Sequence, residues 1–223
     1  MLLVLWDVDG TLVHTGGHGR HAFEEAYETV VGRPFAANVP YAGRTDRQIA
    51  LSMLEGEHDH LPRVLEELEL ALEGRREQVA AEGGAFPGVP ETLAALHARD
   101  DVINSLLTGN IAANAALKVS AFGLERWLDI EVGAYGSDPH EERYELVAIA
   151  RDRAATKYAE PTGAVLVGDT PLDVRAAREA GARAVAVATG FSDVDELRAA
   201  EPDAVLADLS DTAAAVRAIT AST

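Results

Sequence analysis

Short apolar runs alternate with helix-like segments along most of the chain. Each run ends in polar or glycine-rich residues before the helical pattern begins, which is typical of strands buried on both faces of a parallel sheet. The clearest helical segments are residues 90–99 and 174–183, the second with a glycine stop. We therefore predict an α/β fold with a mostly parallel sheet, which binds ligands at the carboxyl ends of its strands. The predicted strands are residues 2–6, 102–107, 130–134, 164–167 and 182–188, with a shorter run at 204–206.

Residues 14–86 follow a different pattern, with no strand-like run. We expect helices at residues 20–31, 46–54 and 61–81, and the last is strongly amphipathic. Glycines gather at both ends of this stretch, which suits a small domain inserted into a larger one with freedom to hinge. We predict a core of residues 1–14 and 87–223 and a helical domain of residues 15–86. The alternative is that these helices only pack on the core.

Composition and charge narrow the class of protein. The 223 residues are 48% hydrophobic and 25% charged, as in an ordinary globular protein. The absence of cysteine excludes disulfides, thiolate zinc sites and cysteine nucleophiles. A net charge of −18 disfavours nucleic acids and anionic membranes as partners. An anionic substrate therefore needs local cations or a metal.

The amino terminus is apolar, but Asp7 interrupts it far short of a membrane span and no basic leader precedes it. We expect a cytoplasmic protein with a small-molecule partner. The sequence leaves open whether it is a monomer or a homodimer.

The first predicted strand leads into Asp7-Val8-Asp9-Gly10-Thr11. Two carboxylates at a strand end are costly unless a positive group lies nearby, and Mg²⁺ prefers such oxygen ligands. The alternative is that Asp7-Val8-Asp9, taken alone, belongs to an ordinary solvated loop.

Polar residues also follow two later strands. Thr108, Gly109 and Asn110 offer donors to phosphate oxygens just before a helix, although Thr108 or Asn110 could simply cap that helix. Asp169 ends another buried strand, and Asp173 follows it as a possible helix cap.

The sequences DVDGT, LLTGN and VGDTPLD, in this order, resemble the first, second and fourth motifs of the haloacid dehalogenase-like superfamily. The helical insert resembles the family's small mobile cap. The resemblance covers the whole chain and implies a Rossmann-like parallel-sheet core with an inserted small α-helical cap domain, most similar to phosphoglycolate phosphatases and β-phosphoglucomutases.

The resemblance implies a role for each motif residue. Asp7 would attack phosphorus to form an aspartyl-phosphate, and Asp9 would act as acid and base. Thr108 would bind the transferring phosphoryl group. Mg²⁺ would be held by Asp7, the backbone carbonyl of Asp9 and Asp169. Secondary contributions fall to Asp173 at the acidic site and to Gly10, Gly109 and Asn110 at the substrate.

The family's third motif is usually a lysine, which this chain lacks at the expected place. Lys118 lies about 10 Å along its helix from the first turn, and Lys157 lies late in another helix, so neither is expected to reach the strand ends. Arg143 stands near the motif position, and its planar fork suits phosphate or carboxylate. The alternative for Arg143 is a surface arginine that balances nearby glutamates.

The loop at residues 41–46 resembles the substrate-facing loop of these caps, and Arg44 is the candidate for an anionic group on the substrate, unless it is a plain surface residue. His14 either lines the pocket or packs. His58 and His60 are more simply explained as a solvated loop than as a metal site.

The resemblance and Asp9 together favour a magnesium-dependent phosphatase of a small phosphorylated metabolite, because the dehalogenase branch has no acid at this position. The alternatives are a sugar-phosphate mutase of the same fold, a 2-haloacid dehalogenase and a non-catalytic binding protein.

Overall fold

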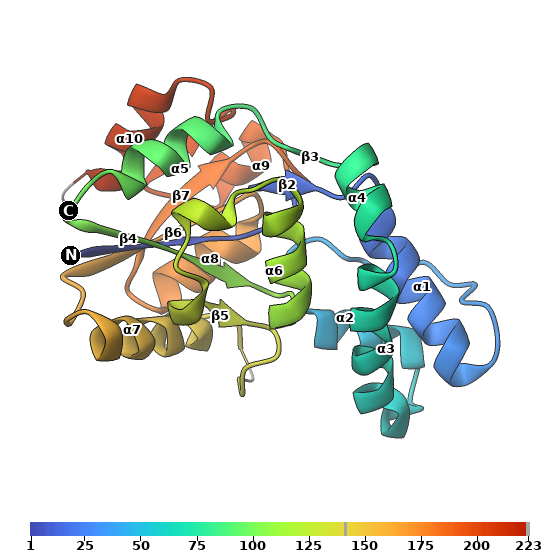
Figure 1. Ribbon diagram of the computed structural model, residues 1–223. Helices are drawn as coiled ribbons and strands as arrows, with labels where there is room; N and C mark the ends of the chain where they lie inside the picture. Colours follow the sequence, from blue (N-terminus) through green and yellow to red (C-terminus); the bar gives the residue numbers. More distant parts are fainter. Residues whose placement is uncertain (141, 222–223) are drawn as a thin grey trace.

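A six-stranded sheet forms the centre of the computed structural model, which describes residues 1–140 and 142–221 (Figure 1). The strand order is β5-β4-β1-β6-β7-β8, and every pairing is parallel. The predicted parallel α/β fold is therefore confirmed. The strands are β1 (Leu2–Trp6), β4 (Val102–Thr108), β5 (Ala134–Tyr135), β6 (Gly163–Gly168), β7 (Arg183–Val187) and β8 (Ala204–Leu206).

Helices cover both faces of the sheet. Alternate residues of the central strand point to opposite sides, and because both sets are apolar, each side must be buried. Val4 and Trp6 belong to one hydrophobic cluster, and Leu3 and Leu5 belong to the other; all four are fully buried. The first cluster is completed by α5 (Val89–His97), α6 (Ala112–Ala121) and α10 (Thr212–Thr220). The second cluster is completed by α7 (Glu145–Lys157), α8 (Pro171–Glu179) and α9 (Val194–Ala199).

The predicted strand at residues 130–134 is wrong in most of its length. A 3₁₀ helix spans Ile130–Val132, started by the Asp129 side chain, which accepts a hydrogen bond from the Glu131 N–H. Strand β5 follows only at Ala134–Tyr135, which pairs with the last two residues of β4. The apolar run was a correct sign of burial, but a side chain-capped turn satisfies its backbone instead of a strand ladder.

The stretch before the second core strand folds into helices α1 (His18–Val31), α2 (Asp46–Leu54), α3 (Leu61–Glu73) and α4 (Arg76–Glu82). They share a third hydrophobic cluster, to which α6 adds Leu117. The predicted helix at 46–54 is confirmed, whereas the one at 61–81 is two helices that separate at Gly74 and Arg75. Glycine is a poor helix former, and here it closes α3.

Two short strands join the helical stretch to the sheet, although no strand was expected there. β2 (Val13–His14) and β3 (Gly84–Ala85) pair antiparallel. They lie beside the predicted domain boundaries, which stay a prediction.

The carboxyl ends of the central strands face helices α1–α4, while the amino terminus lies at the opposite end of the sheet (Figure 1). Polar residues that follow β1, β4 and β6 are thereby enclosed between the sheet and the helices. Among the described helices, none has the length and apolar character that crossing a membrane requires.

Candidate active site

The turn after β1 is packed tightly against the end of β6. The Asp7 N–H donates to the Val167 carbonyl at 2.9 Å, and the Thr11 hydroxyl donates to Asp169 Oδ1 at 3.2 Å. Gly10 has a φ of +87°, and a Cβ there would lie 2.4 Å from Asp169 Oδ2. Only glycine fits this position, so the turn fixes Asp7 and Asp169 side by side.

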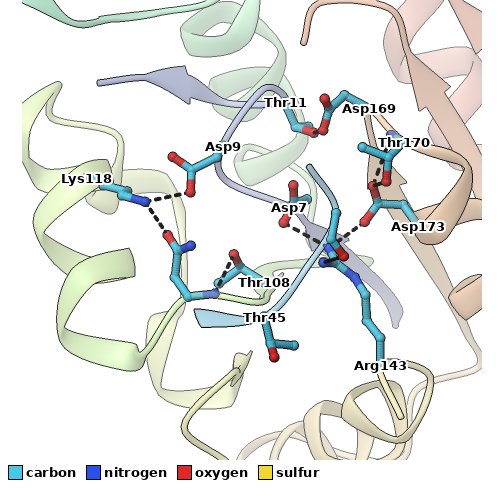
Figure 2. A network of polar contacts seen from close by, with 12 residues as sticks. Asp7, Asp9, Thr11, Thr45, Thr108, Lys118, Arg143, Asp169, Thr170 and Asp173 are labelled. Carbon is cyan, nitrogen blue, oxygen red and sulfur yellow. Dashed lines mark hydrogen bonds and ion pairs between the residues drawn. The ribbon is translucent and has the colours of Figure 1, made fainter. Parts of the chain in front are cut away.

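Three buried carboxylates meet at this point, as Figure 2 shows: Asp7, Asp169 and Asp173. Each offers one oxygen, and the three oxygens lie within 4.8 Å of one another. Burial raises the pKa of Asp7 and of Asp169, and the neighbouring acids raise both further. A hard divalent cation would offset this repulsion, so the donor set fits Mg²⁺.

The prediction for the metal ligands named Asp7, Asp9 and Asp169, of which Asp7 and Asp169 belong to this group. The Asp9 side chain points elsewhere, toward Lys118 (Figure 2), and the role of its backbone carbonyl stays a prediction. Asp173 was expected as a secondary member of the acidic site, with a helix cap as the alternative. It lies in the acidic group and also takes part in capping: α8 begins at Pro171 with Thr170 at the cap position, and Asp173 Oδ2 accepts from both the N–H and the hydroxyl of Thr170.

Arg143 lies between Asp7 and Asp173, at the place expected for the lysine of the family's third motif. Its Nη2 is 3.0 Å from Asp7 Oδ1 and 2.5 Å from Asp173 Oδ1. Burial opposes the charged guanidinium, but the carboxylates of Asp173 and Asp7 outweigh it and hold the pKa of Arg143 above its ordinary value. Its Nη1 also donates to the Gly43 carbonyl, at 3.1 Å, in the loop before α2.

The prediction that Lys118 does not reach the strand ends is wrong. Its Nζ lies 2.6 Å from Asp9 Oδ2 and 2.8 Å from Asn110 Oδ1, and the residue is buried (Figure 2). Helical side chains lean toward the helix amino terminus, so the long lysine stem covers the distance that separates the backbones. The eight-residue spacing from Asn110, about two helical turns, was the signal that could have found this contact. Lys157 does stay away, paired with Asp129 and Glu131.

Neither Thr108, the last residue of β4, nor Asn110 caps the next helix. The Thr108 hydroxyl accepts the Asn110 N–H at 3.3 Å, and the cap position of α6 is taken by Ile111. A Cβ on Gly109 would lie 2.4 Å from the Arg44 carbonyl. Glycine therefore lets the loop before α2 approach this strand end.

Asp46, the first residue of α2, joins that loop to the core. From the sequence this residue was expected only to begin a helix. Its N–H donates to the Gly109 carbonyl at 2.7 Å, and its Oδ2 accepts the Ile111 N–H at 2.8 Å. Burial raises the pKa of Asp46 to about 6, although Lys118 and the Ile111 N–H act in the opposite direction. The nearby Arg44 guanidinium donates to the Ser52 hydroxyl at 3.2 Å.

Replacing Asp46 by asparagine should therefore flatten the pH dependence of stability. The folded protein holds a proton on Asp46 more tightly than the unfolded chain, so this stabilising contribution is present below about pH 4 and lost as the pH rises through about 6. Asparagine still accepts from Ile111 but cannot ionise. The free energy of unfolding of Asp46→Asn, relative to that of the wild type, should therefore rise by up to about 3 kcal/mol between about pH 4 and about pH 7. The difference between the two melting temperatures should increase over the same range. A constant difference, measured in chelator by thermal unfolding, would contradict this.

A cavity of about 490 Å³ opens over these residues, between the strand ends and helices α1 and α2. His14 lines it, whereas His18 is paired with Glu82 at 3.0 Å. His58 and His60 lie in an exposed 3₁₀ turn, and His60 pairs with Glu57. The predicted site residues that line the cavity are Asp7, Asp9, Gly10, Arg44, Thr108, Gly109, Asn110 and Arg143.

Comparison with known proteins identifies the family. The model of the haloacid dehalogenase-like hydrolases matches residues 4–178. A protein of Dickeya dadantii named "Probable phosphatase IndB" is 31% identical, over 97% of this chain and 94% of its own. A phosphoglycolate phosphatase of Synechococcus elongatus is also 31% identical, over 97% of both chains. The crystal structure of a hydrolase from Pseudomonas syringae shares the fold, with a TM-score of 0.70 and 21% identity over 99% of this chain and all of that one. The chain therefore belongs to the haloacid dehalogenase-like hydrolases.

Proposed function

We propose that this hydrolase is a magnesium-dependent phosphatase that removes the phosphoryl group from a small phosphorylated metabolite, in the manner of a phosphoglycolate phosphatase. The observation that carries the proposal is the buried Asp7 carboxylate at the floor of the cavity, held by Arg143, with Asp9 two residues further on the same turn. The names of the curated relatives, a probable phosphatase and a phosphoglycolate phosphatase, support it.

Asp7 and Asp9 divide the chemistry. A carboxylate oxygen of Asp7 forms a bond to phosphorus while the bond from phosphorus to the ester oxygen breaks, and protonated Asp9 gives its proton to that departing oxygen. The product of this step is an aspartyl-phosphate and a free alcohol. Asp9 then takes a proton from the water that attacks phosphorus, inorganic phosphate leaves, and the Asp7 carboxylate is restored.

The surrounding residues position the phosphoryl group and balance its charge. The Thr108 hydroxyl, whose oxygen is already fixed by the Asn110 N–H, and the backbone N–H of Gly109 supply hydrogen-bond donors at the end of β4. Lys118 holds Asp9 over the cavity and offers its ammonium to phosphoryl oxygens. Gly10 also lines the cavity, although its own N–H donates to the Val13 carbonyl.

The acidic group supplies the metal ligands in this proposal. Asp7 and Asp169 would hold Mg²⁺ with the backbone carbonyl of Asp9, and Asp173 lies close enough to take part. When bound, Mg²⁺ shields the nucleophile and the phosphate from their mutual repulsion.

Phosphate release should require Mg²⁺ and be absent in chelator, when phosphoglycolate, sugar phosphates and p-nitrophenyl phosphate are assayed. Mg²⁺ should also raise the melting temperature of the wild type, because a ligand that binds only the folded state stabilises it. At about 100 times its dissociation constant the gain is about 2.7 kcal/mol.

Asp169→Asn should lose this thermal shift, whereas Asp152→Asn, which changes an exposed acid on α7, should keep it. A shift that survives in Asp169→Asn would place the cation elsewhere. Turnover in chelator, or none on any compound with Mg²⁺, would refute the proposed function.

A further inference from the structure

The cavity extends well beyond the residues that handle the phosphoryl group, and its far walls are apolar. At about 490 Å³ it lies within the size range of sites that bind drug-sized ligands. We propose that the alcohol part of the substrate carries a flat apolar ring, which is held between aromatic side chains of the helical segment and of the core. This inference rests on the aspartyl-phosphate chemistry of the proposed function and names a preferred class of substrate other than phosphoglycolate.

The helical segment provides one apolar wall. Phe23 of α1 and Tyr41 meet edge to face, with ring centroids 5.7 Å apart, and both line the cavity. Ile49 of α2 lies in the same lining and is buried. Paired aromatic rings of this kind give a fixed surface against which another ring can pack.

The core provides the other wall. Phe86 follows β3 with its ring 5.6 Å from that of His14, and both residues line the cavity. Phe191 lies in the loop after β7 and is 57% exposed, although its N–H is fixed to Asp169 Oδ2 at 2.8 Å. Binding a ligand that covers a large exposed apolar side chain is favourable, because apolar surface is removed from water.

The charges in the cavity leave little provision for a second anionic group on the substrate. Arg20 is paired with Glu24, Lys118 with Asp9, and Arg143 with Asp7 and Asp173. Arg44 is the one cation of this lining without an acidic partner in the described part of the chain, and it already donates to Ser52. A small substrate with two anionic groups, such as phosphoglycolate, would use Arg44 and leave the aromatic walls against water, whereas a ring would cover them.

Kinetics on matched esters tests this. Ethyl phosphate and 2-phenylethyl phosphate share a primary alkyl leaving group and differ by a ring, and phosphoglycolate represents a small substrate with a second anionic group. With Mg²⁺, kcat/KM for 2-phenylethyl phosphate should exceed that for ethyl phosphate by about 30-fold. It should also exceed that for phosphoglycolate.

Phe86→Ala and Phe191→Ala should each reduce the ratio of the two alkyl esters by about fivefold or more, because each removes part of a wall. Phe35→Ala is the matched control: its ring packs on Tyr27, outside the cavity lining, and should leave the ratio unchanged. The ratio is measured within one protein sample, so partial unfolding cancels. A ratio near one, or one insensitive to Phe86→Ala and Phe191→Ala, would overturn the ring while leaving the phosphatase intact. No turnover of any ester with Mg²⁺ would instead refute the proposed function, and the inference with it.

Discussion

Asp7→Asn should abolish phosphate release with Mg²⁺, by about 10⁴-fold or more in kcat, as expected when the nucleophile of a covalent mechanism is removed. An amide oxygen cannot form the aspartyl-phosphate, and the acidic group loses one of its three carboxylates. The fold should survive, because the two side chains have the same shape and burial already favours a neutral group at this position. Phosphate release and thermal unfolding are measured on the same preparation.

Asp195→Asn is the matched control for that substitution. Its carboxylate is 93% exposed on α9, so activity should be unchanged. Acid quenching of wild-type turnover should trap phosphate on the peptide that contains Asp7, and Asp7→Asn should trap none. Turnover that persists in Asp7→Asn would show that another group attacks phosphorus.

The parallel sheet was predictable because its central strands are buried on both faces. Such strands must be apolar throughout, so their ends show clearly where Asp7, Thr108 and Asp169 begin polar turns. Residues 130–134 were less uniformly apolar, since Glu131 interrupts the run and is exposed, and periodicity alone cannot separate a short buried strand from a buried turn. The hydrogen bond from the Glu131 N–H to Asp129 decided between them.

The contacts across the cavity were harder to predict, because they depend on where the helical segment lies. Asp46 bonds to Ile111, which is 65 residues away, and one of the two partners is a backbone group that carries no sequence signal. Lys118 was misjudged for a different reason: the distance was counted between backbones, although a lysine side chain spans much of that length. Arg143 was predictable by position, since it follows the third core strand and precedes α7.

Arg143→Ala should reduce kcat/KM by about 100-fold or more and destabilise the protein by about 3 kcal/mol, as is typical when one partner of a buried ion pair is removed. The substitution leaves Asp7 and Asp173 buried without their shared counter-charge. It also removes the hydrogen bond to the Gly43 carbonyl, and with it one link between the core and the loop before α2. Steady-state kinetics and thermal unfolding, each with and without Mg²⁺, measure both effects.

Two further substitutions separate the charge of Arg143 from its shape. Arg143→Lys keeps the charge but lacks the planar fork that reaches Asp7, Asp173 and Gly43 together, so it should recover more stability than activity. Arg175→Ala removes an exposed arginine of α8 whose nearest acid is 3.9 Å away, and it should change neither quantity.

Mg²⁺ provides the decisive comparison, because the proposed cation site uses the same carboxylates that Arg143 neutralises. Without the guanidinium the acidic group is more repulsive, so Mg²⁺ should stabilise Arg143→Ala by more than it stabilises the wild type. An equal Mg²⁺ effect in the two proteins would mean that Arg143 and the metal act on separate groups. Unchanged activity and stability in Arg143→Ala would show that Arg143 has no role in the site. Neutralising the negative charge there would then fall to Lys118, whose ammonium lies 2.6 Å from Asp9.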